Sequence, residues 1–308
     1  MKEKVNKLIT SFLAWGPIRV FLSLKFPGAK NVTFGQVLST YYTSLSSSRI
    51  TMRAAAVSFD FFMALFPSVI FLFTLTAYLP IPNFDKLLLE TIQDVLPDYT
   101  YRTIENTITD IISIQRGGLL SFGFVIALFY ATNGTTSLIR SFNALSFVKD
   151  SRPAWQTRLL ALLLTLIFVV ILVLTIIIII FTHYVLGYLI EKGLIDSTIN
   201  LDLIKLGEWF TLLLMILLSV SSLYFFGPEP KIRPTFFSPG SIVSTLLIVV
   251  FLQLFGIFIN QFATFNTVYG SVGALIALMV LINLNALILL AGHELNAVVY
   301  HLKRQTSA

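Results

Sequence analysis

The stretch RAAAVSFDFFMALFPSVIF, residues Arg53 to Phe71, is almost entirely apolar, yet it contains one carboxylate, Asp60. About 20 apolar residues in a helix suffice to cross the roughly 30 Å hydrocarbon core of a bilayer. The composition of the chain supports this setting, because 56% of its 308 residues are hydrophobic and only 12% are charged, against about 25% charged in soluble domains. The stretch therefore predicts a membrane helix in which Asp60 needs a polar neighbour.

Five further long segments have a similar character, so the sequence predicts an all-α polytopic membrane protein with six membrane-spanning helices. The expected spans cover about residues 54–79, 119–142, 159–190, 203–226, 241–262 and 271–299. No linker or low-complexity tract separates them, so residues 35–308 are expected to form a single transmembrane domain.

Two segments outside the spans also show helical periodicity. In residues 1–34, Val5, Leu8, Ile9 and Phe12 recur on one helical face beside lysines, which predicts an amphipathic segment on the cytoplasmic membrane surface. Residues 80–118 are too polar to cross a bilayer, and Pro97 divides them into two periodic halves. We expect an extracytoplasmic helical hairpin there, as a lid or as a gating or docking element.

The distribution of charge predicts the orientation. The first 53 residues carry eight Lys and Arg and a single acid, Glu3, and the segments after the second and fourth spans are also basic. The segments after the first and third spans are acidic. Because Lys and Arg are retained on the cytoplasmic side, both termini are expected in the cytoplasm. The net charge of +6 then reflects topology and contact with anionic lipids, and nucleic acid is not expected as a partner.

Polar residues within the spans predict a binding site. Asn133 and Arg140 share one face of the second span with Ser137, at a depth comparable to that of Asp60. A charge inside the membrane is costly and commonly functional. The expected cytoplasmic-half cluster comprises Asp60, Asn133, Arg140, Asn143, Glu294 and Asn296. A second polar group near the outer face comprises Asn260, Gln261, Asn266 and Tyr269, and Gly270 beside it is a further candidate. The alternative is that these side chains only bridge helices.

The sixth span carries polar residues on two faces. Asn285, Gly292 and Asn296 fall on one side of the helix, and Asn283 and Glu294 fall on nearly the opposite side. Polar groups on both sides indicate a helix that is surrounded by other helices. The first, second and sixth spans are therefore expected to pack side by side.

Signatures of catalysis and metal binding are missing from the sequence. The chain has no cysteine, and His293-Glu294 does not complete an HExxH zinc motif because position 297 is alanine. We find no serine elbow and no phosphate-binding glycine loop. We therefore expect no catalytic residue, no metal site and no cofactor, and the protein is not expected to be an enzyme.

Several stretches in order resemble the YihY/BrkB family of bacterial inner-membrane proteins. They are LFPSVIF (65–71), SLIRSFNAL (137–145), RPAWQTRLLALLLTL (152–166), SPGSIVSTL (238–246) and FNTVYGSVGALIALMVLINLNALILLAGHELNAV (265–298). The resemblance covers roughly residues 35–300 and implies six transmembrane helices in the bacterial cytoplasmic (inner) membrane. Its motif positions here are Pro67, Arg140, Asn143, Tyr269, Gly270, Gly292, Glu294 and Asn296. Asp60 stands where the family tends to have an aromatic or neutral polar residue.

The resemblance implies a role in the cell envelope, since some members of the family are linked to envelope integrity, serum resistance or lipid export. The family has also carried the label ribonuclease BN, which the residues here do not support. We expect a transporter or translocase of an amphiphilic or anionic envelope molecule, with a lipid as one candidate. The alternative is a non-transporting membrane scaffold for envelope assembly. Membrane lipids are the expected partners, and the oligomeric state stays open.

Overall fold

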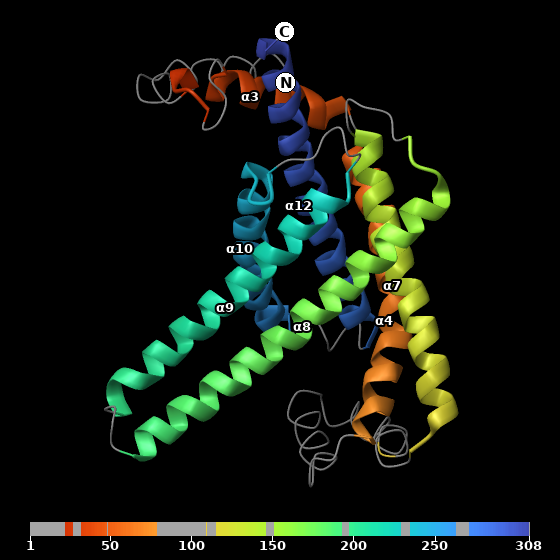
Figure 1. Cartoon of the computed structure of the whole chain (residues 1–308), viewed down its shortest axis with the longest axis vertical. Coiled ribbons are helices and arrows are strands. Elements are labelled where there is room, and N and C mark those ends of the chain that lie inside the picture. Colours follow the sequence, from red (N-terminus) through yellow and green to blue (C-terminus); the bar gives the residue numbers. More distant parts are fainter. Residues whose placement is uncertain are drawn as a thin grey trace.

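The computed structural model describes residues 22–26, 32–47, 49–78, 109, 115–145, 151–192, 197–228, 235–262 and 271–307. Seven helices lie in these ranges (Figure 1): α3 (Phe34–Ser47), α4 (Ile50–Thr76), α7 (Gly117–Leu145), α8 (Ala154–Glu191), α9 (Ser197–Phe226), α10 (Pro239–Phe262) and α12 (Ser271–Ser307). The amphipathic helix expected near the N-terminus and nearly all of the hairpin expected at 80–118 lie outside the described residues.

Six of these helices, all but α3, are long and apolar enough to cross a membrane. The prediction of an all-α, polytopic fold with six membrane-spanning helices is thereby confirmed. The helices extend somewhat beyond the expected spans, most clearly α12, which continues to Ser307. Its last turns project beyond the neighbouring helices, and α3 lies across them (Figure 1).

α12 is the central helix of the described bundle. It packs against α3, α4, α7 and α10, and α4 and α7 form the most extensive helix pair. The first, second and sixth spans therefore meet, as their polar faces predicted. α8 and α9 form a long antiparallel hairpin that runs obliquely away from this group, so its far end stands apart from the other helices (Figure 1).

The two polar faces of α12 meet different neighbours. On one face, Asn283 donates a 3.2 Å hydrogen bond to the Ser58 hydroxyl of α4. On the other face, Gly292 lies so close to α10 that a Cβ there would be 1.7 Å from the Ser244 hydroxyl oxygen. Glycine is thus required at this crossing, as is common where membrane helices approach closely.

A buried aromatic group joins three helices near this crossing. The ring of Phe142 on α7 stacks on His293 of α12, with centroids 4.4 Å apart, and meets Tyr224 of α9 edge to face. The hydroxyl of Tyr224 lies 2.8 Å from that of Ser244 and donates to the Leu289 carbonyl at 2.6 Å. These contacts fix α7, α9 and α10 around α12.

The chain before α3 also packs against the projecting end of α12. Lys25 and Thr33 form an isolated antiparallel bridge, and Val32, only 1% exposed, joins Val298 and Val299 in a small apolar cluster. The described part of residues 1–34 therefore contacts protein in addition to any membrane surface that it covers.

Candidate functional site

A polar pocket lies between α4, α7 and α8. It is lined by Asp60, Asn133, Thr136, Ser137, Arg140 and Arg158, and its volume is about 160 Å³. This volume is about ten times the roughly 10–15 Å³ that holds one water molecule. The pocket therefore has room for a small hydrated polar group beside two guanidinium groups and one carboxylate.

Helical register explains why three of the expected residues meet in this pocket. Asn133 and Arg140 are seven residues apart, which returns the chain to the same face of α7 after two turns. α4 packs along that helix and contributes Asp60, which is half-buried. The structure places these three side chains in the lining of one pocket.

Arg158 is a pocket residue that the sequence reading used only as a topological charge. The buried hydroxyls of Thr135 on α7 and Thr165 on α8 lie 3.0 Å apart and hold the two helices together. Arg158 precedes Thr165 by seven residues, so both lie on the same face of α8. In the sequence, the signal that this face of α8 turns toward α7 was Thr165, a polar residue two turns after Arg158.

Glu294 and Asn296 do not line the polar pocket, so the expected six-residue cluster is divided in the structure. The Glu294 carboxylate accepts a hydrogen bond from the Ser44 hydroxyl of α3. Asn296 accepts one from the Gly240 amide of α10 and donates one to the Ser238 hydroxyl, both at 2.8 Å. Two residues along a helix correspond to a turn of about 200°, which sends these side chains to different neighbours.

The remaining expected residues are placed as follows. Asn143 is buried, 8% exposed, on α7 and is absent from the lining of the polar pocket. Asn260 lies in the last turn of α10, and its side chain is not described. Asn266, Tyr269 and Gly270 lie outside the described residues. The second polar group near the outer face is therefore untested.

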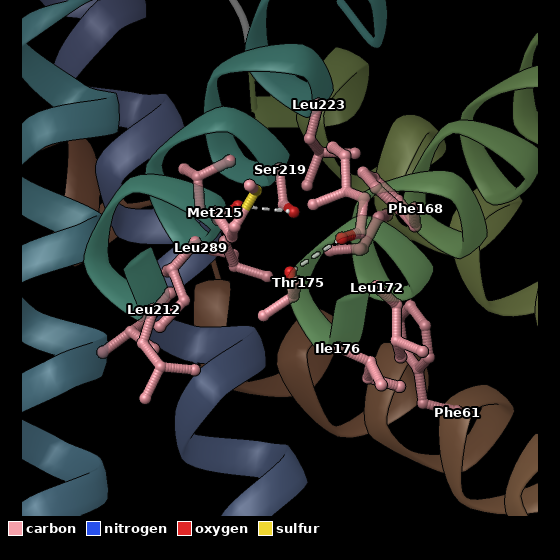
Figure 2. A pocket seen from close by; sticks show the side chains of 15 residues that line it. Phe61, Phe168, Leu172, Thr175, Ile176, Leu212, Met215, Ser219, Leu223 and Leu289 are labelled. Atoms are coloured by element: carbon pink, nitrogen blue, oxygen red, sulfur yellow. Dashed lines mark hydrogen bonds between the residues drawn. The ribbon is translucent and has the colours of Figure 1, made fainter. Parts of the chain in front are cut away.

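An apolar cavity of about 470 Å³ lies between the α8–α9 hairpin and the rest of the bundle (Figure 2). Its lining comes from α4, α7, α8, α9, α10 and α12: Phe61, Leu138, Phe168, Ile171, Leu172, Thr175, Ile176, Leu212, Met215, Ile216, Ser219, Val220, Leu223, Ile248 and Leu289. The volume falls within the roughly 300–1,000 Å³ of pockets that bind small molecules. No charged side chain is among these residues.

The two hydroxyls in the cavity do not make it polar. Thr175 donates to the Ile171 carbonyl at 2.7 Å, and Ser219 donates to the Met215 carbonyl at 2.9 Å. Figure 2 shows both bonds, each closed within its own helix. The cavity thus presents hydrocarbon and satisfied hydroxyls, a surface that suits an alkyl chain better than water.

The polar pocket and the apolar cavity share structural walls. Asp60 lines the pocket and Phe61 the cavity, and the same holds for Ser137 and Leu138 on α7. The ring of Phe61 also lies against α7, since a Cβ on Gly134 would be 3.0 Å from it. Successive residues of two packed helices therefore face a charged pocket on one side and an apolar cavity on the other.

Within the described ranges, no three His, Cys, Asp or Glu side chains lie close enough together to hold a metal ion.

Comparison with known proteins gives the family of the chain. The family model described as "Virulence factor BrkB" matches residues 41–308, which include every described membrane-spanning helix. The chain belongs to the virulence factor BrkB family. The match thus covers all six of the membrane-spanning helices described above.

Curated relatives of this BrkB-family chain occur in several bacteria. One is a Bacillus subtilis (strain 168) protein, YfkH, named as ribonuclease-like, which is 30% identical over 82% of this chain and 90% of its own length. A UPF0761 membrane protein of Vibrio campbellii is 26% identical over 91% of this chain and 85% of its own length. Another, from Janthinobacterium sp. (strain Marseille), is 24% identical over 88% of this chain and 62% of its own length. No solved structure matches.

Proposed function

We propose that the protein translocates an anionic amphiphile of the cell envelope, with an acidic lipid as the first candidate. The observation that carries this proposal is the charged pocket beside an apolar cavity on the shared wall of α4 and α7. An amphiphile needs a place for its charged head and another for its alkyl chain. The two sites together match that chemistry inside the membrane-spanning region.

Arg140 and Arg158 are the proposed ligands of the anionic head. A guanidinium group bonds carboxylate and phosphate oxygens in a bidentate manner. Asn133 and Ser137 line the same pocket and can each donate a hydrogen bond. Asp60 offsets one of the two positive charges, which keeps the pocket from holding an anion too tightly to release it.

The proposal includes the bacterial inner membrane and cytoplasmic termini. α4 begins, α7 ends and α8 begins at the end of the bundle where the chain carries Arg49, Arg53, Arg152 and Arg158. Basic residues concentrate on the cytoplasmic side. The polar pocket then lies in the cytoplasmic half of the membrane, where an anionic lipid made in the cytoplasm would enter.

A membrane scaffold without transport is the second candidate. The contacts of Asn296 and Gly292 with α10 support it, because there the polar and small residues serve only to join helices. A scaffold would need neither a charged pocket nor an apolar cavity. The two candidates therefore differ in what the pocket arginines do.

Reconstitution separates the two candidates. The full chain is placed in liposomes that contain a fluorescent acidic lipid or its zwitterionic counterpart, and movement between leaflets is followed by quenching. We expect wild-type protein to move the acidic lipid, and Arg140→Gln with Arg158→Gln to slow it at least about tenfold, as the loss of two charged hydrogen bonds requires. Arg304→Gln, on an exposed residue at the end of α12, is the matched control. Absence of movement by wild-type protein, or equal rates in the double variant, would contradict the proposal.

A further inference from the structure

Glu294 places a carboxylate inside the helix bundle without a bonded cation among the described residues. Its side chain is fully buried. One oxygen, Oε1, accepts from the Ser44 hydroxyl, and the other, Oε2, has no hydrogen-bond partner in the described part of the chain. An ionised carboxylate in such surroundings costs several kcal/mol, so the group must either find a cation or bind a proton.

Arg53 is the nearby cation, but its guanidinium is bonded elsewhere. It lies on α4 and donates to the Ser141 carbonyl of α7 at 3.3 Å. Ser141 directly precedes Phe142, whose ring stacks on His293, the residue before Glu294. The arginine is thus bonded to α7 at the level at which α7 contacts α12 beside Glu294.

Two other titratable groups lie near Glu294, and neither bonds its carboxylate within the described residues. Tyr41 of α3 donates its hydroxyl to the Ala291 carbonyl of α12 at 3.1 Å. His293 precedes Glu294 on α12, but its ring is stacked on Phe142 of α7. Neither group supplies a hydrogen bond or an ion pair that would satisfy the second carboxylate oxygen.

We propose that Glu294 is a proton-binding site, and that binding and release of the proton move Arg53 between the Ser141 carbonyl and the Glu294 carboxylate. A hydronium ion gives its proton to the carboxylate and leaves as water, and the resulting neutral acid allows Arg53 to stay on α7. Release of the proton to water restores the negative charge. That charge draws the Arg53 guanidinium from α7 toward α12.

Two of the helices joined by this exchange, α4 and α7, also line the polar pocket. α4 carries both Arg53 and Asp60, and α7 carries Ser141 directly after Arg140. A shift of Arg53 between α7 and α12 therefore changes a contact of the two helices that hold the pocket. The proton site supplies a two-state element of the kind that couples one binding event to another. It goes beyond the proposed translocation, because it concerns a different ligand at a different place.

Infrared difference spectroscopy tests the proton directly. The full chain in lipid nanodiscs is taken from alkaline to acid pH, and the carbonyl-stretch region of protonated carboxylic acids is recorded in H₂O and D₂O. We expect one buried-acid band, lost in Glu294→Gln and kept in Glu208→Gln, a matched change on the half-buried Glu208 of α9. Ser44→Ala is expected to shift the band, because it removes the hydrogen bond to Oε1. The proposal would be overturned if the spectrum contained no buried-acid band that is lost in Glu294→Gln.

The movement of Arg53 is tested by spin labelling, for which the absence of cysteine is an advantage. Labels are attached at Met52→Cys on α4 and Gln305→Cys on α12, both exposed. We expect the label-to-label distance to change with pH in the parent and to be constant in Glu294→Gln. A distance that does not respond to pH in the parent would overturn the movement. Both measurements omit the acidic lipid, so their failure is distinct from failure of the proposed function.

Discussion

Gly240 of α10 and Gly292 of α12 meet so closely that a Cβ on Gly240 would lie 2.1 Å from the Gly292 carbonyl oxygen. The two residues fix where α10 crosses the central helix. The same crossing positions Asn296 against the first turn of α10. Backbone contact between α10 and α12 thus depends on the absence of two side chains.

Gly292→Ala is expected to destabilise the protein strongly. Its methyl group would lie 1.7 Å from the Ser244 hydroxyl oxygen and 2.7 Å from that of Tyr224, and overpacking of this kind costs about 1–3 kcal/mol or more. Gly256→Ala on α10 is the control, because a Cβ there meets nothing within 4 Å. Thermal unfolding in detergent should show a much lower melting temperature for Gly292→Ala and an almost unchanged one for Gly256→Ala. Equal melting temperatures would show that the helices do not cross as closely as described.

Asn296→Leu is expected to lower stability through the start of α10. The amide side chain satisfies the Gly240 N–H and the Ser238 hydroxyl in a buried site, and leaving buried partners unsatisfied costs about 1–3 kcal/mol per group. Asn285→Leu should lower the stability less, because within the described residues the Asn285 amide bonds the Leu281 carbonyl of its own helix. The measurement is the midpoint of thermal unfolding for both variants. A larger loss for position 285 would count against the capping role of Asn296.

Arg158→Gln is expected to separate binding from stability. The side chain is exposed, and surface substitutions usually change stability by no more than about 0.5 kcal/mol. Its guanidinium nevertheless lines the polar pocket, so affinity for an acidic lipid should fall roughly tenfold, equivalent to about 1.4 kcal/mol. Native mass spectrometry with acidic and zwitterionic lipids, beside a melting curve, checks both parts. Undiminished preference for the acidic lipid would remove Arg158 from the site.

Ser219→Phe is expected to fill part of the apolar cavity. The Ser219 hydroxyl donates to the Met215 carbonyl of its own helix. Loss of the hydroxyl therefore removes one hydrogen bond from that carbonyl and affects no other helix. The ring would occupy volume that we assign to an alkyl chain, and lipid movement should slow while the melting temperature stays the same or rises. Transport at the wild-type rate by a stably folded variant would show that the cavity is not used.

Tyr41→Phe is expected to change the response to alkaline pH. Burial, and then the negative charge of Glu294, raises the pKa of Tyr41 above the ordinary 10.0. In the unfolded chain this hydroxyl loses its proton near its ordinary pKa, while the folded protein keeps it. Stability is therefore unaffected by this group below about pH 10 and falls as pH rises toward the raised pKa.

At neutral pH the free energy of unfolding of Tyr41→Phe should be about 1 kcal/mol lower than that of wild type, since the hydrogen bond to the Ala291 carbonyl is absent. It should also lose less stability than wild type when the pH is raised above 10. Melting curves at neutral and alkaline pH, with Tyr42→Phe on an exposed residue as the control, check both expectations. If stability fell with pH above 10 as steeply in Tyr41→Phe as in wild type, the alkaline loss of stability would belong to other groups.

The membrane-spanning helices were predictable because hydropathy and length decide them. The meeting of Asp60, Asn133 and Arg140 was predictable from register along two helices. The positions of Glu294 and Asn296 were not, because their partners lie on α3 and at the start of α10, far away in the sequence. Residues 34–47 combine apolar residues with many serines and threonines, and nothing in that composition predicts that Ser44 reaches a carboxylate 250 residues later.

The oblique course of α8 has one further consequence. The helix contains 38 residues and is therefore about 57 Å long at 1.5 Å per residue, nearly twice the roughly 30 Å hydrocarbon thickness of a bilayer. Such a helix leans or extends past the hydrocarbon, and any mismatch with the surrounding bilayer acts on the same hairpin that lines the apolar cavity.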